Sequence, residues 1–227
     1  MIREDFLASS GVPSLDKLLV EGYPDRSAVL IVGSPGIGKE ALGYWFIQTG
    51  LIQEDYCLYV THRRVNDVLR DMKGFGISSE RVPEWMASSE AAKKCDLRDM
   101  TSISFNIKQA FLQNKNRRIR IVTDILSPLL VMNHAESMYH YWSQLLDDLK
   151  QYDFVMLATM EEGMHTATTI TSMEQLFDCV IQLRLYEEGL SVLPLLRFRK
   201  ILGKAPAHGY FRFSFSRESM EVTTFVA

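Results

Sequence analysis

The sequence contains few cysteines and no excess of one charge. Its cysteines form no Cys-x-x-Cys pair and share no zinc-type spacing with histidine, which argues against a disulfide framework and a structural zinc site; they are Cys57, Cys95 and Cys179. With 25 basic and 28 acidic residues the formal net charge is −3, so the basic excess typical of proteins on nucleic acid or anionic membranes is missing. We therefore expect a protein of the reducing cytoplasm, and nucleic acid as a partner only through a local basic patch.

Long apolar runs are also missing. No run approaches the roughly 20 residues of a membrane-spanning helix, and the most apolar segment, 125–132, is interrupted by Pro128. The first residues, MIREDFLASSG, lack the basic and apolar stretches of a signal peptide. We expect neither membrane insertion nor export.

The 227 residues do contain enough apolar side chains for one sizeable domain, with 47% hydrophobic and 23% charged residues. Short β-branched apolar runs alternate with longer segments of helical period, a pattern typical of strands buried on both faces between helices. The runs that we expect to form these strands are 28–32, 56–61, 119–124 and 154–159. The sequence therefore predicts an α/β fold with a mostly parallel central sheet flanked by helices.

The pattern changes after residue 178. Strand-like runs now follow one another directly, joined by turn signals at Glu188-Gly189 and at 206–209. These runs predict an antiparallel C-terminal extension of the same sheet. Because there is no internal repeat or linker, we expect a single domain over residues 1–227.

A glycine-rich segment, GSPGIGKE, directly follows the first strand-like run and opens a segment of helical period. Glycines permit backbone conformations that point successive N–H groups inward, and the helix N-terminus adds positive potential, so such a P-loop wraps a triphosphate. Lys39 would supply a point charge to the β- and γ-phosphates. The alternative is a glycine turn that binds no phosphate. The candidate nucleotide-binding residues are Gly33, Ser34, Pro35, Gly36, Ile37, Gly38, Lys39 and Glu40.

The last position of this segment departs from the P-loop pattern. The pattern has Ser or Thr there, whose hydroxyl ligates Mg²⁺, whereas this chain has Glu40. A carboxylate either pairs with Lys39, which would lower the affinity for a triphosphate, or itself ligates a cation; the sequence leaves both readings open. The second element of a P-loop site is an acidic residue that ends an apolar strand and orders the Mg²⁺ hydration shell. Asp124 is the candidate, and the N-cap of the next element is its alternative role.

Several further segments, in this order and spacing, resemble the KaiC-like branch of the RecA superfamily of ATPases over essentially the whole chain. FVMLATMEE is similar to the family strand that ends in T-T-E, which implies a sensing role for Thr159 and Glu161. Near the C-terminus, Lys200 and Gly203 stand at the Lys and Gly of the family motif K-M-R-G. The lead-in to the P-loop resembles the family pattern G-x-x-x-h-D-x-h-h-x-G-G-h-P at Gly11, Leu15, Asp16, Gly22 and Pro24.

The chain departs from this family at three functional positions. The family reads T-F-E-E-T after its second strand, and the paired glutamates activate the attacking water; here Arg63 and Arg64 replace them, and a guanidinium cannot accept a proton. His62 is adjacent and is a weaker candidate for a base. Leu202 replaces the Arg of K-M-R-G, and Glu40 replaces the Mg²⁺ ligand. We therefore expect nucleotide binding to survive and hydrolysis to be weak or lost.

The resemblance also implies ligands and partners. It implies ATP or ADP as the nucleotide, Mg²⁺ beside Asp124 if the metal is bound, and a contact from Lys200 to nucleotide held by a neighbouring subunit. The family assembles into rings, so a homo-oligomer is implied, and a further protein partner is compatible with it.

Other charged and aromatic residues have two readings each. Arg63 and Arg64 either contact phosphates or lie solvated at a helix N-terminus. The segment 74–99 has few periodic apolar residues and predicts a loop with a short strand, whose Trp85 and Met86 either dock a partner or pack on their own domain. A basic group either contacts a subunit or phosphate or lies on a solvated sheet face; it comprises Arg197, Arg199, Lys200 and Lys204.

Three functions remain open on the sequence. The first is a nucleotide-binding regulatory protein with weak or lost hydrolysis, which the intact Lys39 favours. The second is a RecA-like scaffold that no longer binds nucleotide. The third is a DNA-handling recombinase paralogue, against which the charge balance and the lack of a DNA-binding appendage count.

Overall fold

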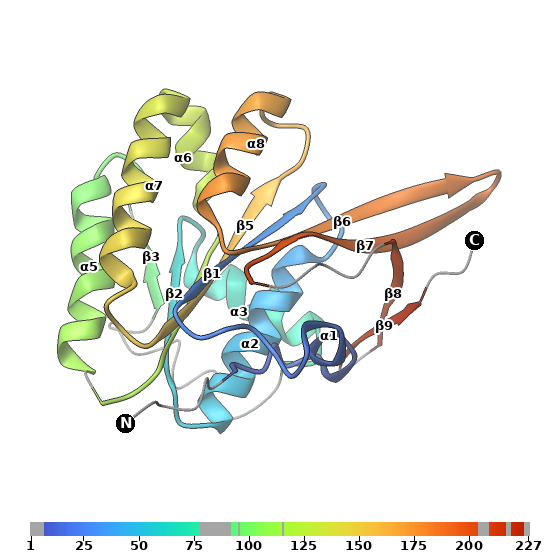
Figure 1. Ribbon diagram of the computed structural model, residues 1–227, viewed down its shortest axis with the longest axis horizontal. Helices are drawn as coiled ribbons and strands as arrows, with labels where there is room; N and C mark the ends of the chain where they lie inside the picture. The colour runs from blue at the N-terminus through green and yellow to red at the C-terminus, as the bar shows by residue number, and fades with distance from the viewer. Residues whose placement is uncertain are drawn as a thin grey trace.

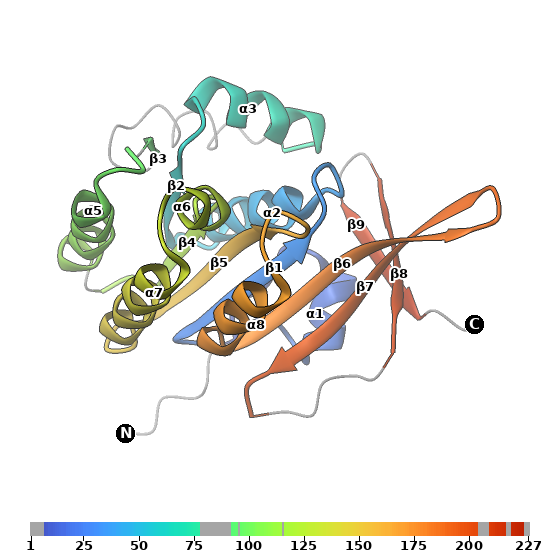
Figure 2. The ribbon, with the colours of Figure 1, turned by 90° about the horizontal axis from the view of Figure 1, so that it is seen from above.

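The computed structural model describes residues 7–77, 92–94, 96–114, 116–203, 209–216 and 219–224. These residues form a nine-stranded sheet with helices packed on both faces (Figures 1 and 2). The strands are β1 (Ser27–Gly33), β2 (Tyr56–Thr61), β3 (Ala92–Lys94), β4 (Ile119–Thr123), β5 (Phe154–Glu161), β6 (Cys179–Glu188), β7 (Ser191–Ile201), β8 (Phe211–Phe215) and β9 (Met220–Thr224). The helices are α1 (Pro13–Leu19), α2 (Lys39–Ile52), α3 (Val65–Gly74), α5 (Met100–Gln113), α6 (Leu126–Met132), α7 (Ala135–Leu149) and α8 (Ala167–Leu176).

The sheet is parallel over most of its width. Its strand order is β3-β2-β4-β5-β1-β6-β7-β8-β9; the pairs from β3 to β6 are parallel and those from β6 to β9 are antiparallel. The predicted α/β fold with an antiparallel C-terminal extension is thus confirmed. Gly33 at the end of β1 lies opposite Glu161 of β5 and Leu183 of β6. The carboxyl ends of the parallel strands meet at one edge, which is where ligands bind in such sheets.

The hydrophobic core has one layer on each face of the sheet. Helices α1, α2 and α3 cover one face, and α2 buries Trp45 and Phe46 there. Helices α5, α6, α7 and α8 cover the other, where α7 buries Trp142. Because both faces are covered, every residue of β1 and of β4 is buried, which explains why the interior of β1 is a continuous apolar run and why Arg120 is the one charged residue in β4.

Four elements were not predicted: α1, α6, α8 and β9. In the sequence, Pro128 appeared to break an apolar patch, yet it is the third residue of α6. The first four N–H groups of a helix have no partner within it, so a proline in the first turn costs no hydrogen bond. Helix α1 is short and buries only Leu15 and Leu19, which is too few residues to show a helical period.

Some predictions fall outside the described residues. The residues concerned are Trp85, Met86, Cys95 and Lys204, together with the turn signal at 206–208. Within the predicted loop 74–99, the structure describes one short strand, β3, which pairs with β2.

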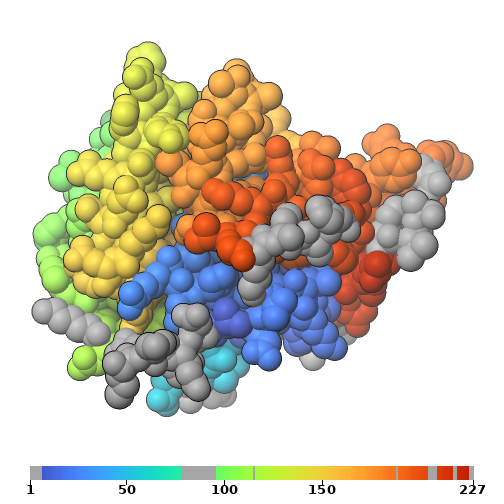
Figure 3. Space-filling view, in the orientation of Figure 1, coloured from blue at the N-terminus to red at the C-terminus, as the bar shows by residue number. Residues whose placement is uncertain are grey.

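Strands β6 and β7 form a hairpin that projects from the sheet. Leu183 of β6 pairs with Gly33, the last residue of β1, and β6 then continues to Glu188 without a neighbour other than β7. The hairpin extends away from the body in both ribbon views and at the right edge of the space-filling view (Figures 1–3). Its outer part exposes apolar side chains, namely Leu185, Tyr186, Leu190 and Val192.

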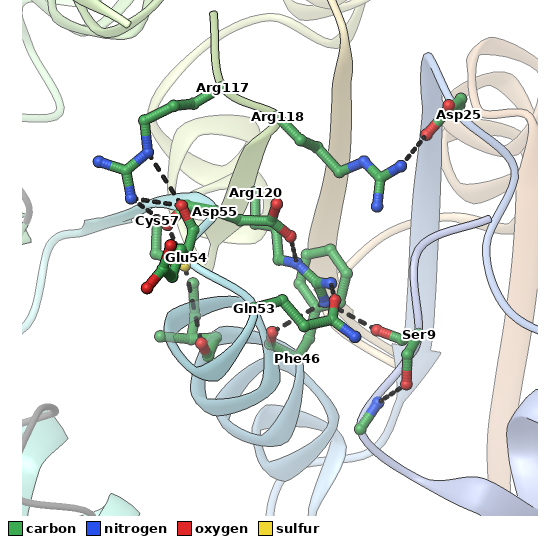
Figure 4. Close-up of polar contacts among 12 residues, drawn as sticks. Ser9, Asp25, Phe46, Gln53, Glu54, Asp55, Cys57, Arg117, Arg118 and Arg120 are labelled. Carbon is green, nitrogen blue, oxygen red and sulfur yellow. Dashed lines mark hydrogen bonds and ion pairs between the residues drawn. The ribbon is translucent and has the colours of Figure 1, made fainter. Parts of the chain in front are cut away.

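A fully buried arginine ties β4 to three other segments (Figure 4). The side chain of Arg120 is 0% exposed, and its Nε lies 2.7 Å from Oδ2 of Asp55. The guanidinium also donates to Gln53 Oε1 at 2.5 Å and to the carbonyl oxygen of Ser9 at 2.7 Å, and it lies over the Phe46 ring at 4.5 Å. Since a buried charge is tolerated only when it is paired and hydrogen-bonded, this network holds the start of the chain against the end of α2.

We predict that Arg120→Ala lowers the free energy of unfolding by about 3–5 kcal/mol, because removal of one partner leaves the other polar groups buried and unsatisfied. The double variant Arg120→Met with Asp55→Asn removes both charges and keeps the volume, so it should lose less. Urea unfolding followed by circular dichroism measures both. A loss below about 1 kcal/mol for Arg120→Ala would show that the network is not stabilising.

Candidate functional site

The P-loop lies between the end of β1 and the start of α2, as the sequence predicts. Gly36 and Gly38 have φ angles of 78° and 87°, a region that L side chains rarely adopt, which is why glycine stands at both positions. A Cβ on Gly36 would meet nothing within 4 Å, whereas one on Gly38 would lie 2.4 Å from Cζ of Phe215. The loop is therefore open at Gly36 and covered by an aromatic ring from β8 at Gly38.

Lys39 is buried at the head of this loop. Its side chain is 1% exposed, and its Nζ lies 2.9 Å from Oε1 of Glu40 and 2.8 Å from Oε1 of Glu161. An ammonium out of water needs counter-charges, and the chain supplies two of them. Of the two readings of Glu40, the structure therefore shows the ion pair with Lys39.

A pocket of about 250 Å³ opens at the carboxyl ends of the parallel strands, and both carboxylates that pair with Lys39 line it. It brings together residues from α2, from the loop after β2, and from the ends of β4 and β5 that are far apart in the sequence. The predicted site residues that line it are Glu40, His62, Arg63, Asp124, Thr159 and Glu161.

Asp124 lies just past β4 and is 8% exposed. Thr61 donates a hydrogen bond to its Oδ2 at 2.8 Å, and Nδ1 of His62 lies 3.6 Å from its Oδ1. Among the described residues, Oδ1 of Asp124 and Oε2 of Glu161 are buried and have no hydrogen-bond partner. Two carboxylate oxygens of this kind beside a P-loop fit a hydrated Mg²⁺ whose other ligands are phosphate oxygens and water.

The two arginines at the family's glutamate positions have different environments. Arg63 donates to the Tyr44 hydroxyl at 3.3 Å and pairs with Asp71, so its guanidinium is neutralised within the chain. Burial raises the pKa of Tyr44, although Arg63 acts in the opposite direction, so Tyr44 stays a neutral phenol. Arg64 precedes α3, is 79% exposed, and pairs with Asp67. Arg63 therefore lines the pocket, and Arg64 matches the reading of a solvated helix start.

Sequence reasoning missed Ser127 and His165, which support the end of β5. Ser127 is buried, accepts the backbone N–H of Glu161 at 2.8 Å, and lies 3.0 Å from Nε2 of His165. Burial lowers the pKa of His165, with Glu161 opposing, so the ring is neutral at pH 7. A helical or strand period gives no signal for such contacts, because the three residues come from a strand end, a helix start and a loop.

The basic group on β7 does not reach the pocket. Arg197 donates to Gln182 Oε1 at 2.7 Å, Arg199 pairs with Glu174 at 2.6 Å, and Lys200 donates to the carbonyl oxygen of Gln175 at 2.9 Å. Leu202 is 58% exposed. Arg197, Arg199 and Lys200 are therefore satisfied within their own chain, on the face of the sheet that α8 covers.

The fold and the glycine loop define a RecA-like P-loop domain. The family model of the KaiC ATPase matches residues 8–224, and the chain belongs to that family. A crystal structure of a KaiC-like protein from the archaeon Pyrococcus horikoshii covers 97% of this chain and 100% of that chain, with a TM-score of 0.78 at 18% identity. At this identity the likeness shows the fold alone.

Two curated relatives match shorter stretches. A UPF0273 protein of Methanopyrus kandleri is 38% identical over 69 residues, which are 30% of this chain and 27% of that protein. The circadian clock protein KaiC2 of Synechocystis is 23% identical over 154 residues, which are 66% of this chain and 27% of KaiC2. The chain thus spans about a quarter of the length of the curated relatives it matches first.

Two features are absent from the described part of the chain. No helix in it has both the length and the apolar character needed to cross a membrane. No group of three or more His, Cys, Asp or Glu side chains in it is arranged to hold a metal ion.

We predict that Gly38→Ala destabilises the protein by about 2–4 kcal/mol, since the new methyl group meets the Phe215 ring and the positive φ is strained. Gly36→Ala is the matched control, because it carries only the backbone strain of about 1–2 kcal/mol. Chemical unfolding of both variants gives the difference. Equal losses at the two positions would show that Phe215 does not restrict the loop.

Proposed function

We propose that this member of the KaiC ATPase family is a nucleotide-binding regulatory protein that binds ATP or ADP and hydrolyses ATP weakly or not at all. The observation that carries the proposal is the buried Lys39, whose ammonium pairs with Glu40 and Glu161, two carboxylates that line a pocket at the carboxyl end of the sheet. A polyphosphate would replace these carboxylates as its counter-charge, while the N–H groups at the start of α2 hold the phosphate oxygens.

The same contacts argue for modest affinity. Glu40 stays within reach of any phosphate bound to Lys39, and two negative groups at that distance repel each other. Mg²⁺ would reduce this repulsion if Asp124 and Glu161, which have unsatisfied buried oxygens, held its hydration shell. We therefore expect nucleotide affinity to depend on the metal through these two carboxylates rather than through a P-loop hydroxyl.

Three features oppose fast hydrolysis. Arg63 occupies a position of the family's general base and is itself a cation. Glu161, a pocket carboxylate, is ion-paired with Lys39 and so already serves as its counter-charge. The exposed Leu202 offers no positive charge to a neighbouring subunit. Phosphoryl transfer needs metal, base and cations in position together, so the loss of several lowers the rate more than the loss of one.

The proposal extends to assembly and location on the family resemblance alone. We propose a homo-oligomeric ring in the cytoplasm, with Lys200 as the trans contact and without nucleic acid as a ligand. In the isolated chain Lys200 donates to a carbonyl oxygen of α8, so ring formation would have to redirect it.

We predict that ATP or ADP raises the melting temperature of the protein and that Lys39→Ala abolishes the shift. At a hundredfold excess over its dissociation constant, a ligand adds about 2.7 kcal/mol to the folded state. Lys108→Ala, which removes an exposed lysine of α5, is the control and should keep the shift. No shift with either nucleotide at millimolar concentration, with or without Mg²⁺, would refute the proposal and favour a scaffold without nucleotide.

We further predict that Glu40→Thr tightens nucleotide binding about tenfold and makes it strictly dependent on Mg²⁺, because the variant frees Lys39 from one carboxylate and adds a hydroxyl ligand. Glu40→Gln is the control, since it removes the charge without adding the hydroxyl, and should tighten binding with little change in metal dependence. Calorimetric titration with and without Mg²⁺ checks both. Identical metal dependence in Glu40→Thr and the natural protein would contradict the assignment of this position.

A further inference from the structure

The end of β5 connects the P-loop pocket to the projecting β6–β7 hairpin. Glu161 is the last residue of β5 and pairs with Lys39 at 2.8 Å. The next residue, Glu162, donates its backbone N–H to the carbonyl oxygen of Gly33, the first P-loop residue, at 2.9 Å. The side chain of Glu161 thus lies in the pocket, and the side chain of the next residue, Glu162, lies at the base of the hairpin.

Glu162 organises a polar cluster at the base of the hairpin. Its Oε1 accepts hydrogen bonds from Gln182 Nε2 at 2.7 Å and from Arg184 at 2.9 Å, both on β6. Gln182 is 1% exposed, and its other amide atom, Oε1, accepts from Arg197 of β7 at 2.7 Å. The Arg197 guanidinium in turn lies over the Tyr210 ring at 5.4 Å. Glu162 therefore links both strands of the hairpin to the end of β5.

The hairpin has little else to hold it in place. Within the described residues β6 pairs only with β7 beyond Leu183, and an isolated two-stranded ribbon is marginally stable in water. The side chains of Leu185, Tyr186 and Val192 are 54%, 50% and 54% exposed, so they add no core. Such an element lies at the low-stability end of a structure, where a small change at its base alters its order.

We propose that Glu161 and Glu162 form a coupling device through which the occupant of the P-loop pocket controls the order of the β6–β7 hairpin. With Lys39 paired to Glu161, the backbone N–H of Glu161 is held by Ser127 and that of Glu162 by the carbonyl oxygen of Gly33. The Glu162 side chain is then placed to accept from Gln182 and Arg184. A phosphate on Lys39 removes the counter-charge of Glu161 and repels its carboxylate, which displaces the 161–162 peptide and loosens the contacts of Glu162. The trigger rests on the proposed nucleotide binding, but the coupling itself does not.

Hydrogen–deuterium exchange of the full chain, read on peptides that cover residues 184–193, tests the coupling without nucleotide. Glu162→Ala should speed exchange of these amides about fivefold, the change that a loss of about 1 kcal/mol produces. Glu161→Ala, which touches none of the hairpin contacts, should speed it by a similar factor. The double variant should be no faster than Glu162→Ala alone, because both act through one path.

Asp148→Ala is the matched control, since it removes a carboxylate from an ion pair with Lys108 that is remote from the hairpin, and it should leave the exchange of 184–193 unchanged. Unchanged hairpin exchange in Glu161→Ala, or additive effects in the double variant, would overturn the inference. Each variant is first checked for the cooperative thermal transition of the natural protein.

The same exchange experiment is then repeated with ATP. In the natural protein ATP should speed the exchange of the hairpin as Glu161→Ala does, and in Glu162→Ala it should raise the melting temperature without a further change in the hairpin. If ATP raises the melting temperature and hairpin exchange does not respond, the coupling is wrong and the proposed function stands. If ATP has no effect on melting but Glu161→Ala still loosens the hairpin, the proposed function fails and the coupling stands.

Discussion

The buried ammonium of Lys39 is the constraint around which the pocket is organised. Lys39 is the first residue of α2, and its side chain is buried. A buried ammonium must be paired with negative charges. Glu40, the next residue of the helix, and Glu161, at the end of β5, both form ion pairs with Lys39. A bound phosphate would pair with the same ammonium. Glu40 and Glu161 therefore compete with the proposed nucleotide for Lys39.

The charge changes at this site are compensated locally. Arg63, at a position where the family has a carboxylate, is neutralised by Asp71 and hydrogen-bonded to Tyr44. Glu40, where the P-loop pattern has a hydroxyl, is neutralised by Lys39. Both changed side chains therefore have a charge partner within the chain, which is consistent with a stable fold.

The layout of the sheet was predictable because each central strand is covered on both faces and so appears as an uninterrupted apolar run, as in 28–32 and 154–159. The helices without a long apolar period were not predictable. Helix α1 buries only Leu15 and Leu19, and the place of Pro128 in the first turn of α6 depends on the helix beginning at Leu126, three residues after the end of β4. Local propensity carries no information on such tertiary context.

Motif spacing alone was enough to place the P-loop, the strand-end Asp124 and the altered position Glu40, because phosphate binding by a loop and helix start is a local property of consecutive residues. The partners of these residues were not encoded locally. That Glu161 reaches Lys39, that Ser127 holds the end of β5 and that Arg120 lies buried on Asp55 follow from the order β2-β4-β5-β1-β6, which sets residues distant in sequence side by side. Strand order results from the packing of the whole chain. A pattern of consecutive residues therefore does not show which residues meet across strands.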